Sequence, residues 1–326
     1  MDKKCILLGI VGDSATGKTT LTRGIVNLLG AENVTAICTD DYHKYNRRQR
    51  KELGITALHP DCNHIDIMEQ HLRDLRAGRS ILKPNYNHST GDFDPPTYVK
   101  PARFVIVEGL LGYHTRILRD QFDVKVFLDP PEALRRQWKV QRDTAKRGYT
   151  PEQVLAALDA READSEAFIR PQKKYADIVV RFYPKQKQTN DARLNAKIGL
   201  SPAQPCEQLS SIIEQIVEEF KDYPCERGSG TPCLHMSFAK WNGRPFEVLD
   251  IHGEIDEAQT NMLKMRLGNL IRARNFDLNM DEVGLFQKGD EVLVSYPLAL
   301  AQLVISYFMI NSSLEVTSPS PASTQA

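Results

Sequence analysis

Short apolar runs alternate with longer segments of helical periodicity through the first 183 residues. Strands are expected at Ile6–Val11, Val34–Cys38, Phe104–Val107, Val124–Leu128 and Ile178–Phe182. Helices are expected at Lys18–Leu29, Asp66–Arg76, Thr115–Arg119, Glu132–Lys146 and Pro151–Phe168. Apolar strands that alternate with helices are typical of parallel sheets covered on both faces. The pattern therefore predicts an α/β fold with a mostly parallel, helix-covered sheet.

The pattern changes after Pro184. Residues 185–205 are polar and poorly periodic, which predicts a linker or an exposed arm. An amphipathic helix at Glu207–Phe220 follows, then strand-like runs at Leu234–Phe238 and Phe246–His252 and two further helices. The Ser-, Thr- and Pro-rich end is typical of a disordered tail. We therefore expect a core at 1–185, a smaller α+β extension packed on it at 186–311, and a tail at 312–326.

Composition narrows the classes of partner and compartment. Lys plus Arg and Asp plus Glu each total 42, so no overall charge favours a nucleic acid, and phosphate binding must come from local clusters. The late apolar run Tyr296–Ile310 is too short to span a bilayer and contains Gln302, which predicts a buried helix and no membrane association. The opening residues show no signal-peptide pattern, which favours a cytoplasmic protein.

The cysteines point the same way. Six are scattered along the chain without a C-x2-C pair, which argues against a zinc ribbon or a disulfide scaffold. Cys225 and Cys233 flank a turn-rich stretch that would let them approach each other. We interpret them as free thiols, in keeping with a cytoplasmic protein.

The candidate chemistry begins with the stretch GDSATGKTT, which lies between the first expected strand and the first expected helix. It fits the phosphate-binding pattern G-x-x-x-x-G-K-S/T. Glycines let backbone N–H groups curl around phosphate oxygens, and the helix N-terminus adds the positive end of its dipole. Lys18 would reach the terminal phosphates and Thr19 would ligate Mg²⁺. The stretch predicts nucleotide binding by Gly12, Asp13, Ser14, Ala15, Thr16, Gly17, Lys18, Thr19 and Thr20.

A second cluster follows the second expected strand. Asp40 and Asp41 fall at its C-terminal end, where open α/β sheets bind their ligands. A carboxylate there can accept the proton of an attacking hydroxyl; only one of the pair is needed, so its neighbour should point away. Such a base with cations beside it indicates an acceptor that itself carries a phosphate, whereas the alternative is a solvated basic loop. The cations that follow are His43, Arg47, Arg48 and Arg50.

Two further segments add charge. An apolar strand delivers Glu108 to its carboxyl end, where an acid would hold Mg²⁺ or its water shell; the alternative is a cap of the next helix. A later helix carries cations at spacings of three and four, with only Asp143 between them. This stripe predicts a lid that closes over the phosphates of ATP. Its members are Lys139, Arg142 and Lys146, with Arg147 close to the end of the helix.

Together these stretches resemble the phosphoribulokinase family of P-loop kinases. The resemblance rests on GDSATGKTT, TDDYHKYNR, KPNYNHSTGDFDPP, VEGLLGYH, WKVQRDTAKRGYT and RPQKKYADIVVR, and it covers residues 3 to about 185. Beyond that it thins to VLDIHGE and DEVGLFQ. It implies a P-loop kinase core with a lid, ATP and Mg²⁺ as cofactors, a sugar phosphate as small-molecule partner, and a homodimer.

The resemblance also implies an activity and roles for residues. The activity is ATP-dependent phosphorylation of the 1-hydroxyl of ribulose 5-phosphate to ribulose 1,5-bisphosphate. Asp40 would be the catalytic base, and Lys18 would stabilise the transferred phosphoryl group. Mg²⁺ would be held by Thr19 and Glu108, and ATP by the phosphate loop with Arg142 and Arg147. The substrate would be bound by His43, Arg47, Tyr86, His88 and Lys139.

One departure from the family pattern bears on regulation. In light-regulated members the phosphate loop carries a cysteine that pairs with another cysteine on the following strand. Here Thr16 holds the loop position, while Cys38 holds the partner position. That disulfide cannot form, so we expect no thiol switch acting through the nucleotide loop.

Two other classes of function remain open. A uridine or cytidine kinase would share the fold and the loop, but its acceptor site would need stacking aromatic rings and amides for a base. Tyr42 and His43 followed by Arg47 favour a sugar phosphate instead, and they disfavour pantothenate-kinase-like chemistry for the same reason. A non-catalytic nucleotide-binding regulator is the third reading. Asp40 and Glu108 argue against it, because a pure binder has little use for a base beside the γ-phosphate.

Overall fold

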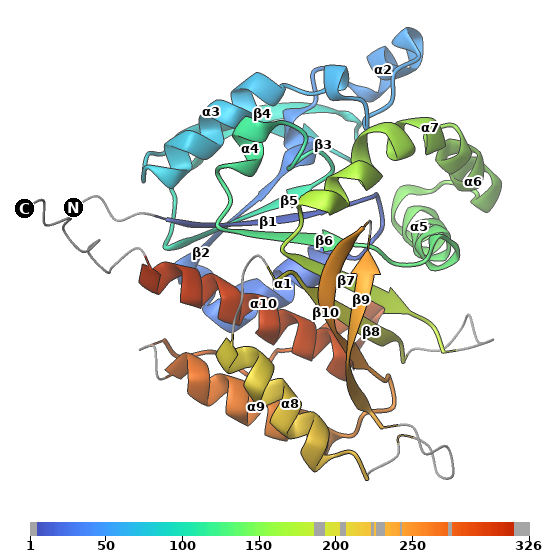
Figure 1. The fold of residues 1–326 in the computed structure, drawn as a ribbon. Coiled ribbons are helices and arrows are strands. Elements are labelled where there is room, and N and C mark those ends of the chain that lie inside the picture. The colour runs from blue at the N-terminus through green and yellow to red at the C-terminus, as the bar shows by residue number, and fades with distance from the viewer. Residues whose placement is uncertain are drawn as a thin grey trace, which may run out of the picture.

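The computed structural model describes residues 5–185, 193–202, 207–222, 225, 232–241, 243–272 and 276–315. One eight-stranded sheet runs through it in the order β2-β5-β1-β6-β7-β8-β10-β9 (Figure 1). The first five strands in that order pair in parallel, and the remaining pairs are antiparallel. The strands are β1 (Ile6–Gly12), β2 (Val34–Cys38), β5 (Phe104–Gly109), β6 (Val124–Leu128), β7 (Ile178–Tyr183), β8 (Asn195–Leu200), β9 (Leu234–Trp241) and β10 (Arg244–Ile251).

Helices cover both faces of the sheet (Figure 1). One face carries α1 (Lys18–Leu29), α8 (Glu207–Glu219), α9 (Glu257–Arg272) and α10 (Tyr296–Glu315). The other carries α3 (Ile65–Arg76) and α4 (Arg116–Arg119). Around the carboxyl ends of the parallel strands lie α2 (Arg47–Leu53), α5 (Glu132–Arg147), α6 (Pro151–Asp159) and α7 (Glu162–Asp164). Two small hairpins complete the fold: β3 (Ile81–Asn87) with β4 (Asp92–Val99), and β11 (Leu285–Lys288) with β12 (Glu291–Val294).

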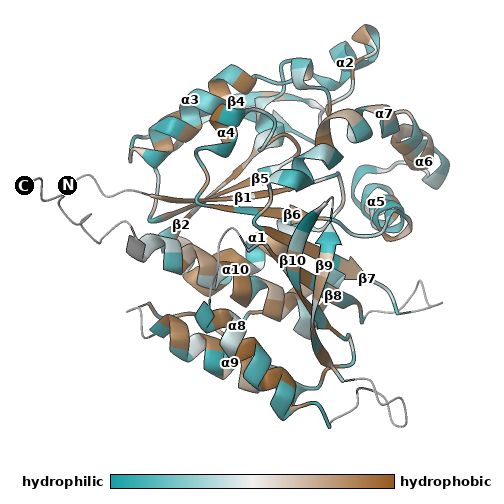
Figure 2. Cartoon of the chain, in the orientation of Figure 1, coloured by the Kyte–Doolittle hydropathy of each residue, from teal (hydrophilic) through white to brown (hydrophobic). Residues whose placement is uncertain are grey.

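The central strands explain why the core has two halves. Side chains alternate along a strand, so Ile6, Leu8 and Ile10 of β1 join the hydrophobic cluster beneath α1 and α10. Leu7 and Val11 join the cluster on the opposite face, with residues of α3 and α4. Figure 2 shows the same division as apolar strands with helices that are polar on their outer sides. The expected mostly parallel, helix-covered sheet is confirmed.

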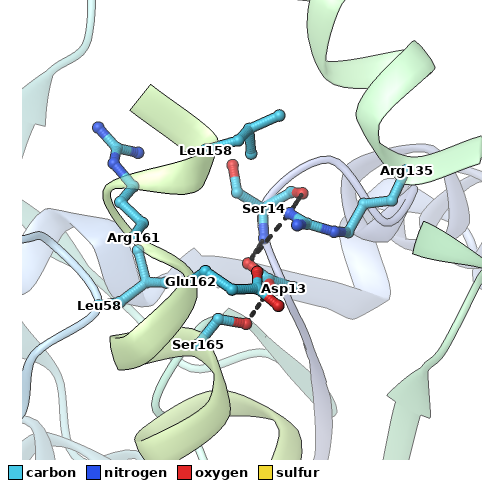
Figure 3. A pocket seen from close by; sticks show the side chains of 8 residues that line it. All are labelled: Asp13, Ser14, Leu58, Arg135, Leu158, Arg161, Glu162 and Ser165. Carbon is cyan, nitrogen blue, oxygen red and sulfur yellow. Dashed lines mark hydrogen bonds and ion pairs between the residues drawn. The ribbon is translucent and has the colours of Figure 1, made fainter. Parts of the chain in front are cut away.

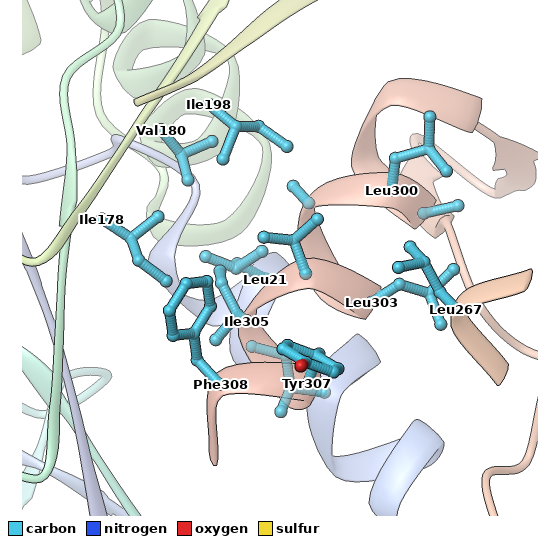
Figure 4. Packing of buried hydrophobic residues seen from close by; sticks show 14 of the residues in the cluster. Leu21, Ile178, Val180, Ile198, Leu267, Leu300, Leu303, Ile305, Tyr307 and Phe308 are labelled. Carbon is cyan, nitrogen blue, oxygen red and sulfur yellow. The ribbon is translucent and has the colours of Figure 1, made fainter. Parts of the chain in front are cut away.

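The late apolar run forms a buried helix, as expected. Ile305 and Phe308 of α10 pack with Leu21 of α1 and with Ile178 and Val180 of β7 (Figure 4). The C-terminal part of the chain is thereby fixed to the helix that follows the phosphate loop. No helix within the described residues is both long enough and apolar enough to cross a membrane.

The largest error of the sequence analysis concerns residues 185–205. The expected linker or arm contains β8, a central strand of the sheet between β7 and β10. Its sequence, NAKIGL, has a weak strand pattern because it contains Gly199. The structure gives a reason for this glycine, since a Cβ at this position would lie only 2.3 Å from the ring of Trp241. Residues 186–192 and 203–206 of this stretch lie outside the described residues.

Three smaller expectations are also wrong. The single helix expected at Pro151–Phe168 ends at Asp159, and α7 and a π-helical turn at Ser165–Ile169 follow it. Cys225 and Cys233 are joined in a disulfide, so they are no argument for a reducing compartment. Helix α10 continues to Glu315, so the first part of the expected tail is helical, and residues 316–326 lie outside the described residues.

Candidate active site

The phosphate loop connects β1 to α1 in the conformation that its glycines allow. Gly17 precedes α1 with φ 95°, a left-handed conformation that side-chain-bearing residues rarely adopt. Ala15 has φ 66° without being glycine, so its backbone carries strain that the surroundings must hold. Thr16 stabilises the turn by donating a hydrogen bond from Oγ1 to the carbonyl of Asp13 at 2.9 Å. The stretch is therefore a folded loop at a helix N-terminus, as phosphate binding requires.

Lys18 lies against this loop. Its Nζ donates to the carbonyl oxygens of Gly12 and Asp13, each at 2.8 Å. Burial lowers the pKa of Lys18, and Asp40, Glu108 and Asp13 oppose that shift. The ammonium is thus placed between the loop and two carboxylates from neighbouring strands.

Thr19 and Glu108 meet at the base of the loop. The hydroxyl of Thr19 donates to Oε1 of Glu108 at 3.1 Å, and Thr22 donates to Oε2 at 3.2 Å. Burial raises the pKa of Glu108, while Lys18 and the two hydroxyls lower it. Glu108 does not cap the helix that follows its strand, because its hydrogen-bond partners are side chains of α1.

These oxygen donors fit Mg²⁺. The ion prefers hard oxygen ligands and usually takes one or two from the protein and the rest from water and substrate phosphates. Thr19 and Glu108 supply such a pair beside the loop. Among the described residues, no group of three or more His, Cys, Asp or Glu side chains could hold a metal by itself. A metal that arrives with the nucleotide suits this donor set better than a permanently bound one.

Asp40 comes from the turn after β2, and strand order brings it to the loop. Cys38 of β2 and Ile10 of β1 both pair with Glu108 of β5, so the three carboxyl ends lie side by side. Oδ1 of Asp40 is buried without a hydrogen-bond partner. Oδ2 lies 3.7 Å from Nε2 of His88. A buried carboxylate oxygen without a donor is costly, so its free lone pairs mark a place where another group can bind.

Charge keeps this carboxylate ionised. Burial raises the pKa of Asp40. The combined effect of His43, His88, Lys18 and Arg142 is opposite and larger, so the net shift of this pKa is downward. Burial also lowers the pKa of both His43 and His88, which favours neutral imidazoles at neutral pH. We therefore assign the lasting positive field on Asp40 to Lys18 and Arg142.

Asp41 points away from this site, as expected. Its Oδ1 accepts a hydrogen bond from the backbone N–H of Tyr86 at 3.0 Å, and its Oδ2 pairs with Lys83. The reason differs from the expected strand alternation, because Thr39–Tyr42 form a 3₁₀ turn. Asp41 anchors hairpin β3–β4, which carries Tyr86 and His88.

Three aromatic side chains stand together beside Asp40. The ring of Tyr86 lies 4.9 Å from that of His43 and 5.1 Å from that of His88, both in edge arrangements. His43 is held by Asn63, with 2.8 Å between Nδ1 and Oδ1. The expected substrate residues His43, Tyr86 and His88 are thus brought together, although their roles stay predictions.

The three arginines of α2 differ from one another. Arg47 donates to the carbonyl of His88 at 2.5 Å, and Arg50 donates to the hydroxyl of Tyr86 at 2.6 Å. The side chain of Arg48 is 82% exposed and pairs with Glu52. Arg47 and Arg50 therefore contact the hairpin that carries Tyr86 and His88, although Arg47 is itself exposed, whereas Arg48 fits the alternative of a solvated side chain.

The cations of α5 converge on Asp143. Lys139 lies 2.8 Å, Arg142 2.8 Å and Arg147 3.5 Å from its carboxylate oxygens, whereas Lys146 is exposed. Lys139 is only 4% exposed, and burial, then Arg142, lower its pKa to about 7. The expected stripe therefore does not include Lys146, whose side chain is exposed. The ammonium of Lys139 faces Asp143. Arg142 and Arg147 both act electrostatically on His88, which places them near Asp40.

Sequence reasoning missed several residues at this site. Asp143 read as an interruption of the stripe, yet it gathers three cations. Arg161 lay unmarked in the expected long helix; it lines a small pocket with Asp13 and Ser14, and burial, then Arg50, lower its pKa (Figure 3). Ser165 binds Asp13 from the turn after α7. The expected helix at Pro151–Phe168 breaks at a place without proline or glycine, so no local signal revealed the contacts of Arg161 and Ser165.

Cys38 bears on the expected absence of a thiol switch. It is a free thiol between Asp40 and Glu108, and burial, then these carboxylates, raise its pKa well above the ordinary value. A protonated thiol is a poor nucleophile. The absence of a switch through the nucleotide loop stays a prediction.

Comparison with known proteins places this site in a family. The model of the Phosphoribulokinase / Uridine kinase family matches residues 7–189, more than half of the chain. The chain belongs to this family. The matched range contains the phosphate loop, Asp40, Glu108 and the cations of α5.

Individual relatives extend the comparison. A phosphoribulokinase of Synechocystis sp. is 45% identical over 181 residues, which cover 56% of this chain and 54% of that protein. A uridine kinase of Staphylococcus aureus is 32% identical over 182 residues, 55% of this chain and 88% of that protein. The solved phosphoribulokinase of Rhodobacter spheroides covers 83% of this chain and 97% of its own at a TM-score of 0.56 and 17% identity, which supports the fold. The chain spans about half the length of the first of these curated relatives.

Proposed function

We propose that the chain is a phosphoribulokinase, which transfers the γ-phosphoryl group of ATP to the 1-hydroxyl of ribulose 5-phosphate. The observation that carries this proposal is the setting of Asp40. Its ionised carboxylate keeps one buried oxygen without a hydrogen-bond partner, beside a phosphate loop on one side and cations on the other. The Synechocystis relative, named phosphoribulokinase, supports the same acceptor.

In this proposal Asp40 is the base. Its free Oδ1 would accept the proton of the sugar hydroxyl as that hydroxyl attacks the γ-phosphorus. A lowered pKa suits this role, because phosphoryl transfer through a loose transition state asks more for positioning and charge stabilisation than for a strong base. The carboxylate takes up the proton late in the transfer and, because its pKa is low, then releases it to solvent.

The remaining roles follow from charge. Lys18 would leave its backbone carbonyls for the terminal phosphates, and Arg142 and Arg147 would neutralise charge on the transferred group. Mg²⁺ bound with ATP would shield the phosphate oxygens, with Thr19 and Glu108 as its ligands from the protein. Arg47, His43 and His88 would bind the phosphate and hydroxyls of the sugar, and Tyr86 would form the wall between them.

A nucleoside kinase is the second candidate, because the chain covers 88% of the Staphylococcus uridine kinase. The rings of Tyr86, His43 and His88 also supply aromatic surface on which a base can stack. Against it stand the exposed Arg47, which donates to the backbone carbonyl of His88, and the half-buried Arg50, which donates to Tyr86. An uncharged nucleoside offers these two cations no counter-charge.

A coupled assay of ADP release tests the proposal. Full-length protein with ATP and Mg²⁺ is given ribulose 5-phosphate, ribose 5-phosphate, uridine and pantothenate in parallel. We expect turnover with ribulose 5-phosphate and at most traces with the others. Turnover with uridine alone would replace the proposal by the nucleoside kinase, and nucleotide binding without turnover on any acceptor would indicate a regulator.

We also propose that the protein is a homodimer. Within the described residues, strand β9 is one of the two edge strands of the eight-stranded sheet, and Phe238 on it is 85% exposed. An open edge with an exposed aromatic side chain is a ready surface for a second copy. Light scattering should give twice the mass of the chain, and Phe238→Asp should shift it toward the monomer; a monomeric wild-type protein would contradict this.

A further inference from the structure

An acidic residue stands in a loop that must attract phosphates, and the structure indicates why. Asp13 is only 7% exposed, and its carboxylate has partners on both sides (Figure 3). Oδ2 accepts a hydrogen bond from the hydroxyl of Ser165, and Oδ1 lies 3.4 Å from Nη1 of Arg135. The guanidinium neutralises a charge that would otherwise repel the nucleotide.

The two partners lie at the two ends of residues 135–165, the segment here called the lid because it includes the cation-bearing part of α5. Arg135 lies in the first turn of α5, and Ser165 opens the π-helical turn after α7; they are 4% and 2% exposed. The segment between them carries Arg142 and Arg147. Both ends of this segment therefore contact Asp13. π-helical turns are rare and are found mostly at functional sites, and here the turn delivers the hydroxyl.

The same contacts act on the backbone of the loop. Nη1 of Arg135 also donates to the carbonyl of Ser14 at 3.2 Å, and the N–H of Ser14 donates to Oδ1 of Asp13 at 2.6 Å. The next residue, Ala15, is the one with positive φ. A left-handed conformation is unfavourable for a residue other than glycine, so it persists only where neighbours hold it.

We propose that Asp13, Ser165 and Arg135 form a clasp that positions the phosphate loop and thereby sets its affinity for ATP. Of the measurements that test this inference, only the KM values rest on the proposed kinase function. The three residues are positioning residues: they hold the backbone N–H groups of the loop where phosphate oxygens will lie. Because the clasp joins the loop to both ends of the lid, it also couples nucleotide binding to the placement of Arg142 and Arg147.

Ser165→Ala tests the clasp most cleanly, because it removes one hydroxyl and leaves every charge in place. We expect the dissociation constant of a fluorescent ATP analogue to rise about 10-fold, the lower end of what loss of a charge-assisted hydrogen bond implies, because Ser165 acts on the nucleotide through Asp13. The KM for ATP should rise in parallel, with the KM for the sugar phosphate unchanged. Ser165→Thr keeps the hydroxyl, and its added methyl group can use the small pocket beside Ser165, so affinity should recover.

Ser210→Ala is the matched control. It removes a hydroxyl that donates to a carboxylate, Oε2 of Glu247 at 3.0 Å, on helix α8 far from the loop in sequence. Its ATP affinity should equal that of the wild type. If Ser165→Ala does not fold, Arg135→Lys serves instead, because it keeps the charge but cannot donate to Ser14 and Glu132 together.

The outcomes separate the clasp from a merely structural contact. Weakened nucleotide binding in Ser165→Ala, restored in Ser165→Thr and absent in Ser210→Ala, supports it. Unchanged nucleotide affinity with a lower melting temperature would overturn it, as would an equal rise in the KM of both substrates. Nucleotide binding is measured without an acceptor, so the test holds if another acceptor replaces ribulose 5-phosphate.

Discussion

The two sides of the candidate site are built in different ways. The nucleotide side, residues 12–20 with Glu108, is one loop and its helix, with a single carboxylate from the neighbouring strand. The acceptor side comes from a turn, a helix and a hairpin, which carry Asp40, His43, Arg47, Tyr86 and His88. Arg142 and Arg147 of α5 act on Asp40 from a fourth segment. The first side is built mainly by local backbone geometry, with Arg135 and Ser165 as supports from distant segments. The second side depends on hydrogen bonds and ring contacts between segments distant in sequence. The experiments below separate the two sides.

Asp40→Asn should have the largest effect. The amide keeps the shape but cannot take the proton, so kcat with ribulose 5-phosphate should fall about 100- to 10,000-fold. The nucleotide side is untouched, and the Kd of an ATP analogue should stay at its wild-type value. Lys18→Met should instead lower kcat and also raise the Kd of the ATP analogue. Near-full turnover in Asp40→Asn would remove this residue from the role of base.

Arg47→Gln tests the acceptor side alone. A charge-assisted hydrogen bond contributes roughly 1.5–3 kcal/mol, so the KM for the sugar phosphate should rise about 10- to 100-fold while that for ATP holds. The neighbouring Arg48, 82% exposed, supplies the control: Arg48→Gln removes the same charge and should leave both KM values unchanged. Equal effects of the two substitutions would mean that only general charge matters.

Lys139 gives a smaller effect that depends on pH. The folded pKa is about 7 and the unfolded value is roughly 10.4, so the unfolded chain binds one more proton between these values. This group therefore adds stability as pH rises through that window. Lys139→Met lacks the effect. Chemical denaturation at pH 6.5 and 9 should show the wild type gaining up to about 2 kcal/mol relative to the variant. A difference independent of pH would contradict the lowered pKa.

Reduction should have the smallest effect. A dithiol opens Cys225–Cys233 in the C-terminal extension, whereas Thr16 leaves Cys38 without a partner in the loop. We expect the KM for ATP to be the same before and after treatment, and non-reducing peptide mapping to recover Cys38 as a thiol. Loss of activity through a bridge to Cys38 would refute this.

The sequence predicted the nucleotide side well, because its determinants are local. The strand before the loop, the helix after it and the residues between them follow from a contiguous pattern, and the structure has β1 and α1 at the expected places. Asp40 and Glu108 were placed from strand ends, which strand order then brought together.

The acceptor side and the extension were harder, because their determinants are distant in sequence. Nothing near His43 indicates that Asn63 holds it, and nothing near Asp41 indicates that it binds Tyr86. The contact of Ser165 with Asp13 on the nucleotide side is equally distant in sequence. Asp143 is different, because its three cations lie within four residues of it on the same helix and their spacing was a local signal. Strand β8 escaped notice since Gly199 weakens its apolar pattern, and the reason for that glycine, Trp241, lies in another strand. Such contacts become visible only when the chain is folded.

The most direct test of the central claim compares ribulose 5-phosphate with D-ribulose, which offers the same hydroxyl without the phosphate. The claim is that the cations around Asp40 recognise a phosphorylated acceptor. A site built to bind a charged group rejects the analogue that lacks it, so kcat/KM should favour ribulose 5-phosphate by about 1,000-fold or more. Comparable values for the two sugars would contradict the account.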